Sequence, residues 1–562
     1  MFHFASFGVE TGSPERGCPV PRESNSAGAG LLLSPRECNA AVLRPRRRGG
    51  AEDRHGVFHF RVAFISTCRR VGFSTYDAGG PPPTRRGVRM EQLQRLIGHV
   101  IDRANLHLKE PFTDVGPYVR ELIPLPSFTR QGAVYAFTGH HPARYVIRES
   151  NAAGSYFLGQ CVVERSVLFQ TDVRGDELKC KGDTVSCSGM KVPVQDHEVI
   201  HVRNSYLVNT LVHSNCHDPG SPEVFDIRDT IAMHYANIHG SPIRGSYLGP
   251  FATVDLTSVQ DSVVGTFSYV QAGELYRERV EDGCVWVRAK DKFECRYTFD
   301  RDVLERYVRF KPGGEPGGII GDFVAQRKSD IDARFDMAEG HPDVPVPERP
   351  SVSRFAVVKG NARIGSDVLV AQRAYVEDTV MGDGSNAQEN CILVGANLEG
   401  RDVTAHGGKI VFARLGKNVF VGFNSFLRGS SDHPLTIGEH SIVMPHTIAD
   451  LDEAVDIPPR HLVYGYIRNR ADLAANTVSL DDLSRCDGEL KRGNLVFRGK
   501  GAAFVHGFEH RIEHILEANG ALFASGHGMG HAQKNANISH SVVRHITEGA
   551  LQGLHPAMEL QA

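Results

Sequence analysis

Histidines one helical turn apart are the first residues of this chain whose spacing could do chemistry. The stretch "VHGFEHRIEHILEANG" contains His510, Glu513 and His514 in the HxxEH arrangement of one class of metalloprotease. On a helix the two imidazoles would share a face and could bind zinc, with the glutamate as base. The motif is short, and little chain remains to supply a third ligand and a substrate cleft. We therefore interpret it as an exposed helix face.

A second group of histidines lies between residues 195 and 240, in "DHEVIHVRNSYLVNTLVHSNCHDPG" and "MHYANIHG". His197 and His201 are four residues apart, and Cys216 precedes His217. Imidazole and thiolate are preferred zinc ligands, but no set in this segment has a recognised ligand spacing. The glycine-rich stretches "KPGGEPGGIIGD" and "SGHGMGH" lack the spacing of a phosphate-binding loop. A metal site within 195–240 stays an open alternative, and the glycine-rich stretches receive no assigned chemistry.

Composition excludes several classes of partner. The 562 residues carry a formal net charge of −3, which gives no reason to expect nucleic acid or an anionic membrane. No apolar run approaches the roughly 18 residues that span a bilayer. The eleven cysteines are scattered without a CxxC pair. We expect a cytoplasmic protein that binds neither nucleic acid nor membrane.

The first 89 residues differ from the rest of the chain. They hold fourteen Arg and no Lys against seven acidic residues, a net charge of +7, which leaves −10 for the other 473. They show no sustained period of 2 or 3.6. A targeting leader is one interpretation, but such leaders are poor in acidic residues. We favour a disordered or mis-assigned leader over 1–89, with the real start at Met90, where an amphipathic helix is expected.

An internal repeat of six residues is the strongest structural signal. Apolar residues recur every sixth position, as in Leu415, Val421 and Leu427, and a small or β-branched residue follows four positions later. A period of six fits one flat side of a triangular parallel β-helix, in which the first residue of each hexad fills the interior. The repeat therefore predicts a mainly β protein, a parallel β-helix whose coils stack by parallel pairing.

The hexads occur in two blocks, which gives the expected domain organisation. We expect a helical N-terminal segment over 90–144, a first β-helix block over 145–280 and a second over 351–475. An inserted helix and linker occupy 281–350. A histidine-rich C-terminal region follows over 476–562, with helices expected at 505–518 and 541–552.

The repeat resembles the left-handed β-helix, or hexapeptide-repeat, superfamily, and most closely in motif its γ-class carbonic anhydrases. Residues of that class's motif recur here in identity and spacing: Arg373, Gly382, Asn386, Gln388, Glu389 and Asn390. The three zinc histidines of the class are replaced by Val394, Phe423 and Arg428, none of which can bind zinc. We therefore expect no metal at that site. His406 could substitute as a ligand, but a lone histidine in "VTAHGGK" is interpreted as exposed loop surface.

Acyltransferases of the same superfamily place a histidine at a subunit boundary, where it acts as general base. The stretch "RGSSDHPLTIGEHSIVMPHTIADL" offers His433, beside Asp432, and His446, which the hexad phase turns outward. The resemblance makes these two the catalytic candidates and implies an acyl-CoA donor and a small-molecule acceptor. It also implies a homotrimer, for which outward Phe420, Phe423 and Phe426 supply an apolar patch. The alternative is a non-catalytic, γ-carbonic-anhydrase-like scaffold or assembly subunit.

Overall fold

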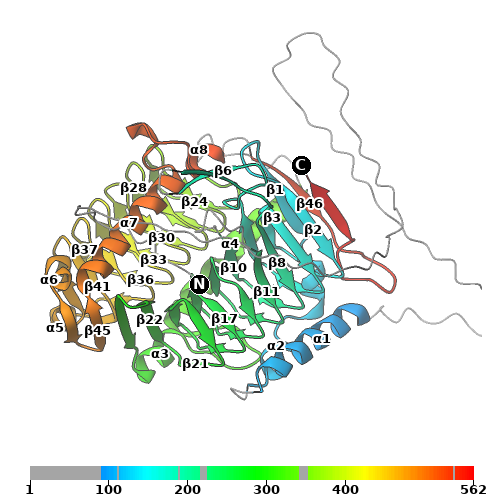
Figure 1. The fold of residues 1–562 in the computed structure, drawn as a ribbon, viewed down its shortest axis with the longest axis horizontal. Coiled ribbons are helices and arrows are strands. Elements are labelled where there is room, and N and C mark those ends of the chain that lie inside the picture. The colour runs from blue at the N-terminus through cyan, green and yellow to red at the C-terminus, as the bar shows by residue number, and fades with distance from the viewer. Residues whose placement is uncertain are drawn as a thin grey trace, which may run out of the picture. The chain divides into compact units, whose positions relative to one another are not determined.

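The computed structural model describes residues 90–109, 113–187, 190–214, 224–340, 352–535 and 538–561. The expectation of a leader over 1–89 lies outside these residues. The described chain is mainly β, and most of its strands are short and pair in parallel (Figure 1). No helix within these ranges is long and apolar enough to cross a membrane.

The first β-helix block has three walls of parallel strands joined by short turns. One wall contains β5 (Asp172–Gly175), β10 (Leu211–His213), β13 (Asn237–His239), β16 (Thr253–Asp255), β19 (Tyr269–Gln271) and β22 (Cys284–Ala289). The second contains β8 (Val199–Arg203), β11 (Val224–Arg228), β14 (Ile243–Arg244), β17 (Ser258–Gln260) and β20 (Glu274–Tyr276). The third contains β4 (Val167–Phe169), β9 (Tyr206–Val208), β12 (Ile231–Ala232), β15 (Tyr247–Leu248), β18 (Val263–Val264) and β21 (Arg279–Val280). The long β3 (Tyr156–Glu164) opens the block by pairing with both β5 and β8.

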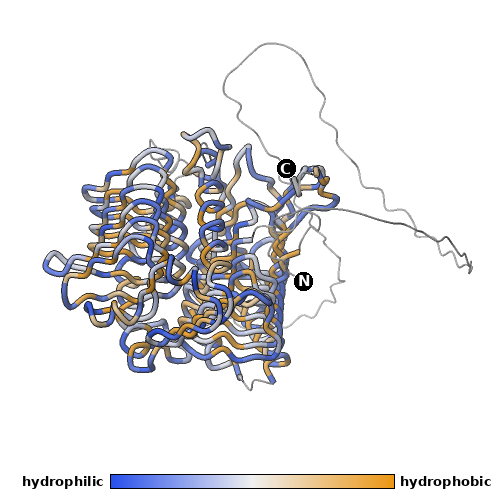
Figure 2. The backbone as a smooth tube through the Cα atoms, turned by 60° about the vertical axis from the view of Figure 1, so that its left-hand side comes forward, coloured by the Kyte–Doolittle hydropathy of each residue, from blue (hydrophilic) through white to orange (hydrophobic). Residues whose placement is uncertain are grey.

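The second block repeats this plan. Its first wall contains β24 (Val357–Lys359), β27 (Tyr375–Glu377), β30 (Ile392–Val394), β33 (Lys409–Val411), β36 (Phe426–Arg428), β39 (Ile448–Asp450) and β42 (Tyr466–Ile467). The second contains β25 (Arg363–Ile364), β28 (Val380–Met381), β31 (Asn397–Leu398), β34 (Ala413–Leu415), β37 (Leu435–Ile437) and β40 (Val455–Ile457). The third contains β26 (Leu369–Val370), β29 (Asn386–Ala387), β32 (Val403–Thr404), β35 (Phe420–Val421), β38 (Ile442–Val443) and β41 (His461–Val463). Leu415, Val421 and Leu427 are buried in its interior, as the hexads predict. Figure 2 shows apolar positions recurring from coil to coil. The predicted left-handed β-helix in two blocks is confirmed.

The two blocks pack against each other along a seam within the one chain. Phe251 and Phe267 of the first block share a buried cluster with Phe420, Phe423 and Phe426 of the second. The expectation that these three phenylalanines form an exposed patch is therefore wrong, because the first block covers them. Two helices border the seam: α4 (Gly318–Gly340) packs on the wall of β24, β27 and β30, and α7 (Gly501–Asn519) contacts β32.

The remaining elements lie around the first block and the far end of the second. Helix α1 (Glu91–His107) buries the predicted apolar stripe against the third wall of the first block. Strands β46 (Ser539–Val543) and β47 (Met558–Gln561) pair antiparallel with β1 (Ala133–Phe137) and β2 (Arg144–Arg148). The helix expected over 541–552 is therefore wrong, since the C-terminal segment supplies edge strands instead. The smaller elements are α2 (Gly116–Val119), α3 (Arg301–Tyr307), α5 (Arg470–Ala475), α6 (Leu480–Ser484), α8 (His531–Lys534), β6 (Thr184–Cys187), β7 (Met190–Pro193), β23 (Phe293–Thr298), β43 (Thr477–Ser479), β44 (Asp487–Arg492) and β45 (Leu495–Lys500).

Candidate functional site

The wall of the first block that faces the seam carries a ladder of polar side chains at the ends of its strands. Arg174 pairs in register with His213, His213 with His239, and His239 with Asp255. Each is the third residue of a strand segment whose middle residue, such as Val212 or Ile238, fills the interior. Parallel pairing at about 4.8 Å per strand stacks these polar groups above one another. The ladder therefore follows directly from the hexad phase.

The second block contributes a matching row from the turns between its walls. Glu389, His406 and Phe423 occupy the same place in three successive coils. His406 lies in the turn between β32 and β33 and is 2% exposed. Its interpretation as exposed loop surface is therefore wrong, because the first block covers the turn. The residues that follow in these turns, Asn390, Gly407 and Asn424, adopt a positive φ.

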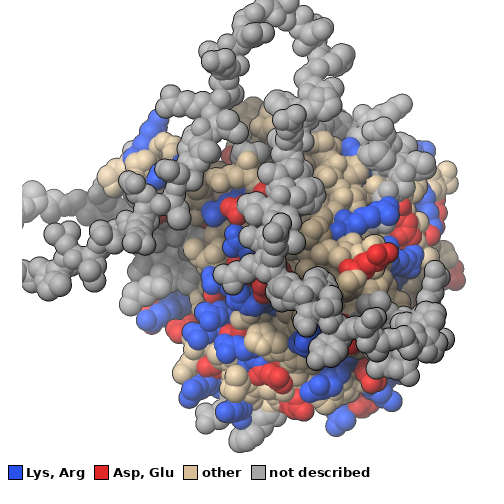
Figure 3. Space-filling model, turned by 90° about the vertical axis from the view of Figure 1, so that its right-hand side faces the viewer, with Lys and Arg blue, Asp and Glu red and all other residues tan. Residues whose placement is uncertain are grey.

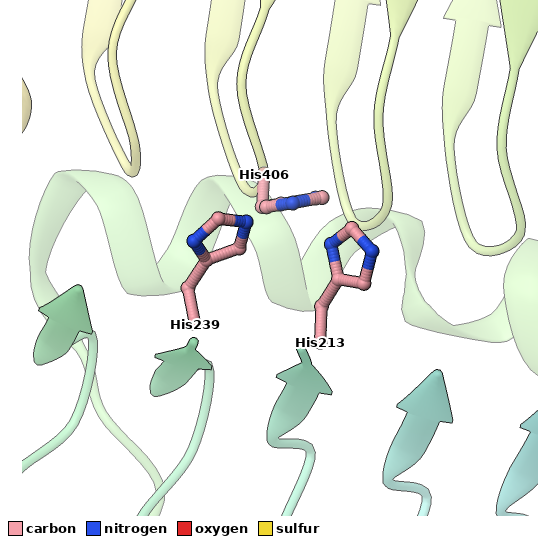
Figure 4. Close-up of side chains that lie close together, drawn as sticks. All are labelled: His213, His239 and His406. Atoms are coloured by element: carbon pink, nitrogen blue, oxygen red, sulfur yellow. The ribbon is translucent and has the colours of Figure 1, made fainter. Parts of the chain in front are cut away.

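His213, His239 and His406, hereafter the seam histidines, come together where the ladder meets this row. Figure 4 shows the first two rising from neighbouring strands toward His406 on the facing turn. One nitrogen of each imidazole lies within 4.8 Å of the other two. The ring centroids are 5.1 Å apart for His213 and His239. His239 keeps 12% of its side-chain surface exposed, so the cluster reaches solvent on that side.

Each seam histidine faces a carboxylate. His239 Nδ1 lies 2.9 Å from Asp255 Oδ1, and His406 Nδ1 lies 2.8 Å from Glu389 Oε2. His213 Nε2 is 3.5 Å from Glu177 Oε1, too far for a good hydrogen bond. Within the described part of the chain neither nitrogen of His213 has a hydrogen-bond partner. A carboxylate on one nitrogen fixes the tautomer and orientation of an imidazole and leaves its other nitrogen free.

Arginines from outside the histidine cluster hold two of these carboxylates in their ionised form. Arg511 of α7 donates to both oxygens of Asp255, at 2.7 and 3.0 Å, and Arg174 contacts Glu389. Burial acts to raise the pKa of both carboxyls, but the arginine and histidine partners hold each pKa below its usual range. Burial lowers the pKa of His239 and His406, with partial compensation from their carboxylates. His239 and His406 are therefore neutral near pH 7.

A second cluster adjoins the first. His141, Asp176 and His531 offer atoms that lie within 4.8 Å of one another. His531 Nε2 is 2.6 Å from Glu177 Oε1, so Glu177 lies between His531 and His213. Arg174 donates to both oxygens of Asp176, at 3.1 and 2.6 Å.

A small cavity lies next to the seam histidines on the α4 side. Its volume is about 40 Å³, enough for more than one water molecule. Buried Lys409 lines it and donates to Gly407 O at 2.5 Å and Asn424 Oδ1 at 3.3 Å. Burial lowers the pKa of Lys409 to about 7. Asn424 also donates to Phe251 O of the first block at 3.1 Å, which ties the two blocks together at this point.

The two predicted catalytic histidines lie apart from this cluster. His446 does leave its own β-helix, as the hexad phase predicts, but it enters the seam and is fully buried, with Nε2 3.1 Å from Thr253 Oγ1. His433 lies partly exposed before β37, in a turn on another corner of the second block. His510, Glu513 and His514 lie on the exposed face of α7, as interpreted from the sequence.

The positions matched to the carbonic anhydrase motif serve mainly to join the blocks. Arg373 Nε donates to Asp172 of the first block at 2.8 Å, and Glu389 contacts Arg174. Among the replaced zinc positions, Phe423 packs its ring 5.5 Å from His239, and Arg428 pairs with Asp450 at 2.6 Å. Val394 is the half-buried end of β30.

Comparisons with known proteins agree with this architecture. The profile of a family described as "Hexapeptide repeat including loop" matches residues 190–312. A crystal structure of a "putative acetyltransferase" from Desulfovibrio desulfuricans G20 is 46% identical, covers 84% of this chain and 99% of its own, and superposes with a TM-score of 0.78.

Two further solved structures are only distantly similar. A Bacillus cereus protein also titled a putative acetyltransferase is 16% identical, covers 30% of this chain and 92% of its own, and has a TM-score of 0.17. GDP-perosamine N-acetyltransferase from Caulobacter crescentus, solved with CoA and GDP-perosamine, is 18% identical, covers 30% and 81%, and has a TM-score of 0.10. No curated protein matches the chain. None of the three structures is titled a carbonic anhydrase, so that resemblance stays a prediction.

Proposed function

This chain belongs to the hexapeptide-repeat proteins of the left-handed β-helix class, and we propose that it transfers an acyl group from an acyl-CoA thioester to a small-molecule acceptor at the seam histidines. One observation carries the proposal. A histidine hydrogen-bonded to a buried carboxylate, His239 on Asp255, lies at the boundary between two β-helices. Acyltransferases of this superfamily use a histidine at such a boundary, there formed by two subunits. Here the two blocks of one chain supply it.

The proposed reaction sets clear demands on the site. The acceptor oxygen or nitrogen attacks the thioester carbonyl carbon, the carbon–sulfur bond breaks, and the acceptor's proton ends on the released CoA thiol. Neutral, oriented imidazoles are suited to activate the acceptor. The carboxylates behind His239 and His406 fix those rings, and Arg511 and Arg174 keep the carboxylates ionised. These contacts favour an enzyme over the scaffold alternative, which requires no such network.

The catalytic roles predicted from the sequence for His433 and His446 are the alternative to the seam histidines. His446 is held neutral by burial, which lowers its pKa to about 3 and makes it a weak base.

We also keep the homotrimer and the cytoplasmic location as proposals. The trimer now depends on family analogy alone, because Phe420, Phe423 and Phe426 are covered within the chain. Light scattering is expected to give a particle mass three times that of one chain. The mass of a single chain would contradict the trimer. Figure 3 shows one face of the molecule, and where grey atoms do not hide it, basic and acidic side chains are interspersed.

The experiment is a search for transfer with the full chain. Acetyl-CoA is mixed with panels of amino sugars, amino acids, amines and sugars, and the released CoA thiol is measured together with the mass of the product. The proposal predicts acceptor-dependent thiol release and an acetylated product. The proposal is contradicted if folded protein releases CoA thiol no faster than buffer alone with every acceptor tested.

A further inference from the structure

We propose that His213, His239 and His406 bind a divalent zinc-type cation through one nitrogen each and leave a fourth coordination position open. The three imidazoles come from both blocks, and a ligand nitrogen of each lies within 4.8 Å of the others. None stands at a position where the carbonic anhydrase motif would place a histidine. The site is therefore built from different residues, and it exists only because the two blocks pack together.

The donor set favours zinc. Three neutral imidazoles with an open fourth position are a common arrangement of catalytic zinc, with zinc–nitrogen distances of about 2.0–2.1 Å. Ligand nitrogens around such a tetrahedral ion lie roughly 3.3 Å apart. The ligand nitrogens, now within 4.8 Å of one another, would have to approach by at most about 1.5 Å to bind an ion. The triad offers no oxygen ligand, which disfavours calcium and magnesium.

The surroundings of the triad have the form that metal-binding histidines require. A metal-bound imidazole usually donates its other N–H to a carboxylate or carbonyl. Asp255 lies on Nδ1 of His239 and Glu389 on Nδ1 of His406, which leaves Nε2 of each ring to bind the ion. Each of these carboxylates also has an arginine partner, Arg511 for Asp255 and Arg174 for Glu389.

His213 supplies an independent observation. It is more than nine-tenths buried and faces the other two rings, yet neither nitrogen has a hydrogen-bond partner among the residues that the structure describes. Buried polar groups without partners are rare in native proteins and call for an explanation, such as an ion. A cation at the centre of the triad would satisfy one nitrogen of His213 and leave the other toward Glu177.

The neighbouring cluster of His141, Asp176 and His531 is a weaker candidate. Arg174 already donates to both oxygens of Asp176, which leaves only two free nitrogens and places a positive charge beside them. Among the described residues no Lys or Arg is hydrogen-bonded to a seam histidine, and the nearby arginines contact the carboxylates instead. An ion bound by the seam histidines would occupy their free nitrogens, so the ion would activate the acceptor in place of an imidazole, by lowering the pKa of a hydroxyl in its open position. This consequence alone depends on the proposed function.

The test measures metal content in the absence of substrate. The full chain is dialysed against EDTA, titrated with zinc sulfate, desalted and analysed by mass spectrometry for bound zinc. Cobalt(II) replaces zinc for a visible spectrum. We expect one zinc per chain and the intense spectrum of four-coordinate cobalt without a thiolate band. The proposal is overturned if the chain retains no zinc at micromolar concentration or if cobalt gives the weak spectrum of a six-coordinate ion. This measurement uses the wild-type chain and therefore does not depend on the folding of any variant.

Variants locate the ion. His213→Gln, His239→Gln and His406→Gln are each expected to weaken zinc binding more than about 100-fold, and Asp255→Asn and Glu389→Gln by about 10- to 100-fold. His234→Gln is the matched control, because His234 is equally buried in the first block, lacks hydrogen-bond partners and lies outside the triad. His531→Gln tests the neighbouring cluster. Folded triad variants that keep wild-type affinity, or loss of zinc in His531→Gln alone, overturn the proposal. Intact zinc binding without acyl transfer would reject only the proposed function.

Discussion

His239 and His406 belong to different β-helical blocks, yet their ring centroids lie 5.7 Å apart. The first is the last residue of β13 and the second lies in the turn between β32 and β33. Only the packing of the two blocks brings them together. The seam is therefore both the main structural junction of the chain and its candidate site, and most of our predictions concern it.

The ion pair between Arg373 and Asp172 is expected to hold the blocks together at neutral pH. Both side chains are buried, and Arg373 also donates to Gly154 O at 2.6 Å. Arg373→Gln leaves a buried carboxylate unpaired and should cost about 3–5 kcal/mol of unfolding free energy at pH 8. Adding Asp172→Asn should recover most of this loss. Equal stability of the single and double variants contradicts the role of the pair.

The same pair predicts a pH dependence with a definite sign. Burial raises the pKa of Asp172 to about 6 despite Arg373, above the 3.8 of an unfolded chain. A raised carboxyl pKa destabilises the folded state above that pKa and has no effect below the unfolded value. Without Arg373 this penalty grows. The loss caused by Arg373→Gln should therefore be larger at pH 8 than at pH 5 in urea unfolding, and a loss independent of pH would be the contrary result.

His446 is expected to destabilise the fold in acid. Burial lowers its pKa to about 3, partly offset by a backbone hydrogen bond at Phe267. An unfolded histidine titrates near 6.5, so stability is full above that pH and falls by about 1.4 kcal/mol per unit as the pH drops toward 3. His446→Gln should flatten the curve of unfolding free energy between pH 6.5 and 4. The partly exposed His433→Gln is the control, and an unchanged slope in His446→Gln contradicts the assignment.

Apolar packing along the seam is expected to stabilise the single chain. Phe426 is fully buried in the cluster that both blocks share, whereas Phe412 is 51% exposed. Phe426→Ala should lower the unfolding free energy by about 3–5 kcal/mol, and Phe412→Ala should change it little. Thermal unfolding of the two variants at equal concentration measures the difference. Similar melting temperatures would mean that the blocks do not depend on this contact.

Local periodicity sufficed to predict the coils. The phase of Leu415, Val421 and Leu427 placed each in the interior, where the structure has them. The C-terminal segment was harder, because residues 539–543 become a strand only by pairing with β1, far away in sequence. An isolated sequence pattern carries no information about such a partner.

The site needed information that the hexads do not contain. His213 and His239 end the similar segments "LVH" and "NIH", and aligning these by phase would have stacked the two imidazoles. Nothing local indicates that His406 faces them, since that contact depends on how two β-helices pack side by side. The outward direction predicted for His446 was correct, but the side chain contacts Thr253 of the first block and not solvent.

The most direct test of the central claim compares acyl transfer by two variants with an acceptor found in the panel. His239→Gln alters the seam histidines, and the double variant His433→Gln, His446→Gln alters the pair that the sequence suggested. Loss of an activating histidine typically costs about 10²–10⁴ in rate. We predict that kcat falls by at least about 100-fold in folded His239→Gln and stays near the wild-type value in the double variant. Wild-type turnover in His239→Gln together with loss of activity in the double variant would contradict the account and move the active site to His433 and His446.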